Sequence, residues 1–279
     1  MTSSKALFKQ MFLQKRRYAN LILLIQVFAV VFMFLMGIIF KGSNNLVNNF
    51  AGLIADNSNS WDLLLGIGTI TTFLADVALF CLLCWQNEKI NLSQTWQLIP
   101  TSSSKIWVIN IFSSLIECAY LFVIQIVLGL VVLIFDSYSH HIPFFTRSDF
   151  TINHDSLSAI SGVFEELLGL IGLCLLIFVF ISLANFLTRI IVDQLPVKST
   201  TGIKLIVMAV LVIVAVFIAA QVNDQVTIMY YNHLVAHSKT LDMDLIGVTA
   251  LEYWIGAIIL GIINCLLVQK FVESKIINR

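Results

Sequence analysis

Six long apolar runs, separated by shorter polar stretches, dominate the chain. They lie near residues 20–40, 63–85, 106–135, 167–187, 203–222 and 246–268. A helix of about 20 apolar residues crosses the roughly 30 Å of hydrocarbon in a bilayer. The runs lack the in-and-out alternation of barrel strands, and a helix satisfies its backbone polar groups within its own segment in lipid. The pattern predicts an all-α integral membrane protein with six transmembrane helices.

Composition agrees with this pattern. Of the 279 residues, 59% are hydrophobic and 11% are charged, which is too little charge for the surface of a water-soluble domain. The six spans use most of the chain, so we expect residues 1–279 to form a single transmembrane domain. All five cysteines fall inside predicted spans, and no disulfide framework is indicated.

Basic residues predict the orientation, because Lys and Arg stay on the cytoplasmic side when loops are short. With six spans, both termini lie on the same side. The cations on that side are Lys5, Lys9, Lys15, Arg16, Arg17, Lys89, Lys105, Arg189, Lys198, Lys204, Lys270, Lys275 and Arg279, against only Lys41, Arg147 and Lys239 on the other. The sequence therefore predicts cytoplasmic termini.

The first 19 residues form an amphipathic lead-in to the first span. Leu7, Met11 and Tyr18 share one helical face, whereas Lys5, Lys9 and Arg16 lie opposite them. A helix of this kind is expected to lie on the inner membrane surface. A frayed basic tail is the alternative.

The connection after the second span, residues 86–105, is longer than a membrane hairpin requires. Leu92, Trp96 and Ile99 follow i, i+4, i+7 spacing, and Pro100 ends the helix they predict. This short helix has an apolar stripe with Trp96 at its centre. It either lies flat on lipid headgroups or docks into a protein partner.

Asp76 and Glu117 are acids in the middle of the second and third spans, where charge is costly. Counted from the helix ends, they lie at similar depth, so they are expected to face one polar cavity on a translocation path. The alternative is that each is a packing residue at a helix contact. Their expected hydrogen-bond partners are Asn110, Gln125, Asn185 and Asn264.

Other motifs point away from chemistry in this chain. The sequence contains no G-x-x-x-x-G-K-[ST] loop to cradle phosphates, so any use of ATP requires another chain. No metal site is expected, because the histidines of the outer loops lack the acid of an H-E-x-x-H motif.

The run QNEKINLSQTWQLIPTSSSK, from Gln86 to Lys105, resembles the segment after the second span in permease subunits of type 2 ATP-binding-cassette transporters of Gram-positive bacteria. The six-span layout and the basic lead-in are also similar. In that family the segment is a cytoplasmic coupling helix that fits a groove on a separate ATPase. The resemblance implies coupling roles for Glu88, Leu92, Trp96, Ile99 and Pro100.

The resemblance also implies a function. The chain would be a non-enzymatic permease subunit, and ATP and magnesium would bind to the partner ATPase rather than to this chain. It would pair with a second permease copy or a paralogue in the plasma membrane of a bacterium, in contact with lipid and not with nucleic acid. Export of peptides, drugs or lipid-linked molecules is expected. The alternatives are an intramembrane enzyme or a proton-coupled carrier that uses Asp76 and Glu117.

Overall fold

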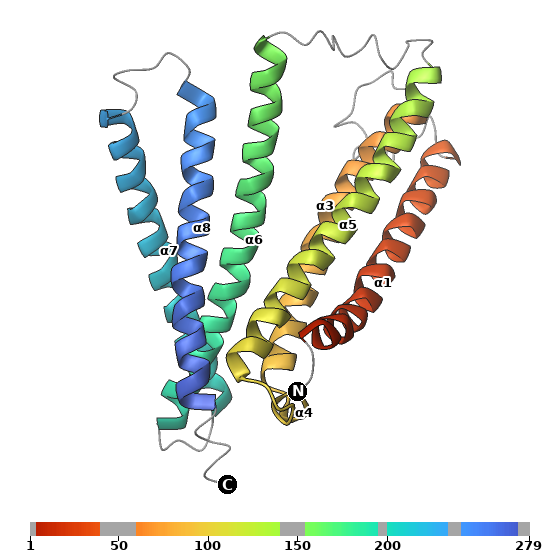
Figure 1. The fold of residues 1–279 in the computed structure, drawn as a ribbon. Helices are drawn as coiled ribbons and strands as arrows, with labels where there is room; N and C mark the ends of the chain where they lie inside the picture. The colour runs from red at the N-terminus through yellow and green to blue at the C-terminus, as the bar shows by residue number, and fades with distance from the viewer. Residues whose placement is uncertain (1–3, 40–59, 140–153, 195–199, 234–240, 273–279) are drawn as a thin grey trace. The chain divides into compact units, whose positions relative to one another are not determined.

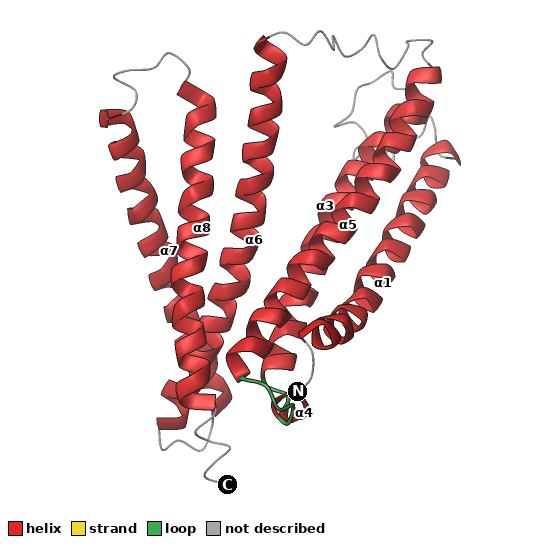
Figure 2. Ribbon diagram, viewed as in Figure 1, coloured by secondary structure: helices red, strands yellow, loops and turns green. Residues whose placement is uncertain are grey.

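The computed structural model describes residues 4–39, 60–139, 154–194, 200–233 and 241–272, and within them every regular element is a helix (Figures 1 and 2). The elements are α1 (Ser4–Ile39), α3 (Ser60–Asn91), α4 (Gln94–Gln97), α5 (Ser103–Ser139), α6 (His154–Gln194), α7 (Thr200–His233), α8 (Leu241–Leu267) and the π-helical turn η1 (Val268–Val272). The prediction of an all-α chain is confirmed.

Six of these helices are long and apolar enough to cross a membrane, as the hydrophobic pattern predicted. Their apolar surface is largely uncovered by protein. In α7, for example, none of the residues in the most apolar window is buried within the chain. Such a surface is stable only in lipid, so the chain is a multi-pass membrane protein.

The prediction of the orientation rests partly on connections that lie outside the described residues. These connections hold Lys41, Arg147 and Lys239, the three cations expected on the non-cytoplasmic side. The orientation of the termini stays a prediction.

The contacts divide the chain into two compact units. Unit 1 comprises Met1–Ser4, Asn87–Ile111 and Ile152–Arg279, and unit 2 comprises Lys5–Gln86 and Phe112–Thr151. Helices α3 and α5 therefore each contribute one end to unit 1 and the remainder to unit 2. The single domain expected for residues 1–279 stays a prediction.

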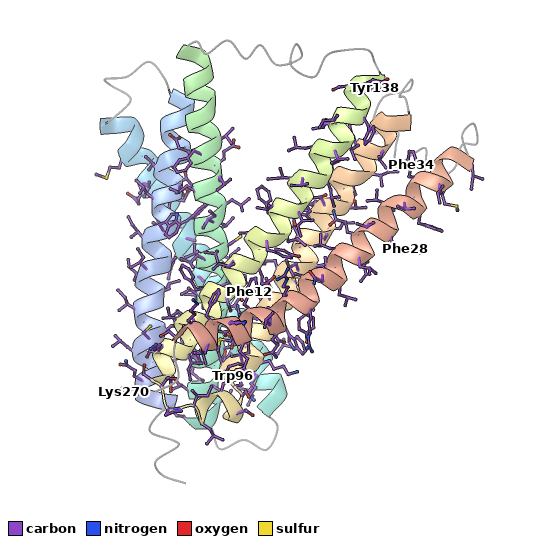
Figure 3. The ribbon with its side chains drawn as sticks, turned by 45° about the vertical axis from the view of Figure 1, so that its right-hand side comes forward. Phe12, Phe28, Phe34, Trp96, Tyr138 and Lys270 are labelled. Carbon is purple, nitrogen blue, oxygen red and sulfur yellow. The ribbon has the colours of Figure 1, made fainter. Side chains whose placement is uncertain are left out.

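Unit 2 is built from α1 and the longer parts of α3 and α5. The expected lead-in and the first span form one continuous helix, α1. Its buried face is a single stripe at helical spacing, made of Leu7, Met11, Lys15, Ala19, Ile22 and Gln26. The opposite face is apolar and exposed in the C-terminal half, where Phe28 projects from the helix (Figure 3).

Unit 1 is built around the contact between α6 and α8. Gly169 lies against Ala250, Gly172 against Trp254, and Leu176 against Gly256, so residue numbers rise together along both helices and the two are parallel. Asn264 extends this register, because its side-chain amide donates a 2.8 Å hydrogen bond to the carbonyl of Val179. Small residues at the contact let two apolar helices approach closely.

Candidate functional site

The connection between α3 and α5 differs from the single helix that the apolar stripe predicted. Helix α3 continues to Asn91, and the amide of Leu92 still bonds the carbonyl of Glu88 at 3.0 Å. Only Gln94–Gln97 is helical beyond it, as α4. A 2.6 Å bond from the Thr101 amide to the Ile99 carbonyl makes a tight turn around Pro100. The predicted helix across Leu92, Trp96 and Ile99 is wrong in its extent, because the chain breaks at Ser93 and again after Gln97.

The five residues expected to couple to an ATPase occupy different environments. Leu92 and Pro100 are exposed, whereas Trp96, Ile99 and Glu88 are partly buried. Trp96 lines a small recess within unit 1 (Figure 3), together with Ile90, Asn91, Ser103, Ile106, Trp107, Phe186 and Val268. Trp96 is therefore partly covered by residues of the chain's own helices. The most exposed apolar side chain of the connection is Leu98, at 81%.

Glu88 belongs to a polar cluster that joins the end of α3 to α6 in unit 1. One carboxylate oxygen accepts hydrogen bonds from the hydroxyl of Ser182 at 2.8 Å and the amide of Asn91 at 3.2 Å. Asn185 also bonds this carboxylate, and Arg189 acts on it electrostatically. Glu88 thus joins α3 to α6, and its coupling role stays a prediction.

The same cluster reaches α5. The side-chain amide of Asn110, which is fully buried, donates 3.0 Å hydrogen bonds to the backbone carbonyl of Asn87 and to the side chain of Asn91. The start of α5 and the end of α3 are therefore fixed to one another by polar contacts. Ser104 continues this fixation to α8, because its hydroxyl donates to the carbonyl of Cys265 at 3.2 Å.

Asp76 lies in a second polar cluster, within unit 2. Its side chain bonds that of Gln125 on α5. The amide nitrogen of Gln125 also donates to Gln26 on α1 at 3.1 Å, and Gln26 donates to the hydroxyl of Thr72 on α3 at 2.9 Å. This cluster links all three helices of unit 2 within their membrane-spanning segments.

Glu117 lies in a third cluster, in which its neighbours are cations of α1. Lys15 and Glu117 are both completely buried. The ammonium of Lys15 donates hydrogen bonds to Ser113 at 2.8 Å and Ser114 at 2.7 Å. Lys15 and Arg16 both act electrostatically on Glu117. Among the described residues, neither carboxylate oxygen of Glu117 has a hydrogen-bond partner.

The two acids thus have different partners. Gln125, which bonds Asp76, lies eight residues after Glu117 on α5, a rise of about 12 Å along the helix. Of the four expected partners of these acids, only Gln125 fills that role. Asn110 and Asn185 belong to the Glu88 cluster, and Asn264 donates a hydrogen bond to the backbone carbonyl of Val179. The assignment of Asp76 and Glu117 to a translocation path stays a prediction.

The sequence reasoning missed Lys15. It was counted only among the cations that predict the orientation, but it shares the buried stripe of α1 with Leu7, Met11 and Ala19. The spacing of four residues from each of its neighbours in that stripe is the signal that could have found it. In the part of the chain that the structure describes, no group of three or more His, Cys, Asp or Glu residues is placed to hold a metal ion.

Comparison of the chain with family models, with curated proteins and with solved structures found no match in any of the three.

Proposed function

We propose that this protein is the membrane-spanning subunit of a transporter that a separate cytoplasmic ATPase drives. The observation that carries the proposal is the connection between α3 and α5, which exposes two leucines at the end of two membrane-spanning helices. Leu98 is 81% exposed and Leu92 is 43% exposed. Because the connection links the spans outside their apolar segments, these side chains suit an apolar groove on a protein partner.

The contacts around this connection support the idea that a movement of α4 would be passed on to the spanning helices. The Glu88 cluster joins the ends of α3 and α5 to α6, and Ser104 joins α5 to α8. A partner that displaces α4 would therefore displace the ends of several spanning helices together. The free energy must come from a difference in how the ATPase contacts the connection in its two nucleotide states.

The remaining features follow from the resemblance of Gln86–Lys105 to the coupling segment of type 2 ATP-binding-cassette permeases. The partner ATPase binds ATP and magnesium, and this chain is not itself an enzyme. Two permease chains, identical or related, enclose the path in a bacterial plasma membrane, with the termini and the α3–α5 connection in the cytoplasm. The transported molecules are peptides, drugs or lipid-linked compounds.

Co-purification tests the proposal. The full chain, with an affinity tag, is co-expressed with the product of a neighbouring gene that encodes Walker motifs, and the membranes are extracted in mild detergent. We expect the two proteins to elute together and the ATPase rate to depend on the permease. If no ATPase associates with the folded chain, this function is excluded.

The alternatives, an intramembrane enzyme or a proton-coupled carrier, require Asp76 and Glu117 to act as a pair. The contacts favour neither, because Asp76 bonds Gln125 whereas Glu117 faces Lys15 and Arg16.

A further inference from the structure

The N-terminal part of α1 carries a cationic stripe, made of Lys5, Lys9 and Arg16. At 100° per residue these three side chains fall within about 40° of one another around the helix. All three are exposed, whereas Leu7, Met11 and Lys15 on the other side of the helix are buried inside unit 2. The helix is therefore held by one face and presents its cations on the other.

This stripe lies beyond the part of α1 that must cross the membrane. Helix α1 has 36 residues, which corresponds to about 54 Å, whereas the hydrocarbon layer is about 30 Å thick. Figure 1 shows the first turns of α1, in dark red, at an angle to the rest of the helix. The turns that carry Lys5 and Lys9 are thus available to the headgroup layer.

The N-terminal segment that carries the stripe contains basic residues and no acidic residue. The first acidic residue of the chain is Asp56, so the first 55 residues hold cations only. Within the described residues, no carboxylate forms an ion pair with Lys5 or Lys9. Arg16 differs, because Glu117 attracts it.

Aromatic rings flank the stripe. Phe8 and Phe12 stack with their ring centroids 5.9 Å apart (Phe12 is labelled in Figure 3). The guanidinium carbon of Arg16 lies 5.9 Å from the ring centroid of Phe12 and 4.9 Å from that of Tyr120. Leu13, beside the stripe, is 48% exposed and apolar. Cations flanked by aromatic and aliphatic side chains match the boundary between phosphate groups and acyl chains.

We propose that the stripe of Lys5, Lys9 and Arg16 binds the phosphate groups of anionic phospholipids. The lysines supply mobile point charges, and the guanidinium of Arg16 offers planar donors that can bond two phosphate oxygens. Each basic side chain near an anionic lipid surface strengthens binding by about fivefold. The site is independent of the proposed coupling to an ATPase, since α4 contributes nothing to it.

The test uses the full chain reconstituted in vesicles of phosphatidylglycerol and phosphatidylcholine. The protein is extracted, and the two phospholipids that remain bound are quantified by mass spectrometry. The variant Lys5→Gln with Lys9→Gln removes two cations of the stripe and leaves Arg16 in place. Arg17→Gln is the matched control, because Arg17 is exposed on the same helix but about 80° from Lys9 around it. Elution volume and thermal unfolding confirm that each variant is folded.

We expect the wild-type chain to retain phosphatidylglycerol over phosphatidylcholine. The double variant should lose this preference by about 25-fold, whereas Arg17→Gln should lose much less. Equal retention in the double variant and the wild type overturns the proposal, as does an equal loss in the control, which indicates a general effect of net charge. Inorganic phosphate that binds the delipidated chain as tightly as phosphatidylglycerol would assign the stripe to a soluble phosphate instead of a lipid.

Discussion

Lys15 and Glu117 are completely excluded from solvent on neighbouring helices of unit 2, and the cation acts electrostatically on the acid. Serines rather than the carboxylate receive the hydrogen bonds of the ammonium, at 2.7 and 2.8 Å. The oxygens of Glu117 have no hydrogen-bond partner among the described residues, so Arg16 and Lys15 are the groups that favour its charged form. We therefore expect the stability of the chain to depend on Lys15 and Glu117 together.

Lys15→Met should destabilise the chain by about 1–3 kcal/mol, because it removes the hydrogen bonds to Ser113 and Ser114 and one of the two cations that act on Glu117. Lys15→Met combined with Glu117→Leu should recover much of the loss, since apolar side chains can replace a buried charge pair at little cost. Thermal unfolding in detergent measures both effects. Lys9→Met, an exposed cation on the same helix, serves as the control. A double variant as unstable as Lys15→Met would show that the two charges do not depend on each other.

Leu98→Glu and Trp96→Glu should distinguish an effect on ATPase binding from an effect on the stability of the chain. Leu98 is 81% exposed, so a charge there should change the free energy of unfolding by less than about 0.5 kcal/mol. If Leu98 anchors the ATPase, the same change weakens association by about 2 kcal/mol, or about thirtyfold in Kd.

Trp96→Glu instead places a charge at the recess that Ile106 and Phe186 help to line and should destabilise the chain by about 2 kcal/mol. Paired measurements of unfolding temperature and of ATPase pull-down distinguish the two variants. If Trp96→Glu leaves the unfolding temperature unchanged but abolishes the pull-down, Trp96 is the docking side chain, as the apolar stripe predicted.

Gly172→Ala should weaken the contact between α6 and α8. A Cβ at this position would lie 2.9 Å from Cδ1 and 3.0 Å from Nε1 of Trp254. The indole must then move, which endangers its 3.1 Å hydrogen bond to the carbonyl of Leu168. We expect a loss of about 1–3 kcal/mol in thermal or denaturant unfolding.

Gly261→Ala is the matched control for this substitution. A Cβ there meets nothing within 4 Å in the described residues, so alanine should be neutral or stabilise α8 by up to about 1 kcal/mol. Equal effects of the two substitutions would mean that the close approach at Gly172 does not limit packing.

Cysteine crosslinking should distinguish the partners of Asp76. In a background without the five native cysteines, Asp76→Cys should crosslink with Gln125→Cys through a short bifunctional reagent, because their side chains are in contact. Asp76→Cys with Glu117→Cys should crosslink poorly, since Glu117 lies about two turns from Gln125 on α5. Efficient reaction of the second pair would instead support the shared cavity inferred from their similar depth.

The end of α3 shows where reasoning from a sequence pattern stops. Leu92, Trp96 and Ile99 have the spacing of one helical face, but helix α4 is too short to hold all three. Short-range spacing cannot reveal that Asn110 bonds Asn91 or that Trp96 lines a recess with residues of α5 and α6, because those contacts join residues distant in sequence. The same applies to Glu88, for which the resemblance implied a coupling role and which accepts a hydrogen bond from Ser182 in the structure.

The number of spanning helices was determined by the sequence by itself. Transfer into lipid depends on the apolar content of each segment, and a helix satisfies its own backbone, so neither property needs a neighbour. The rotation of each helix was decided only by the tertiary structure. Spans that are apolar on all sides carry little signal for the face that meets protein. Burial of Lys15, separation of Asp76 from Glu117 and the parallel contact of α6 with α8 therefore depend on how side chains pack between helices.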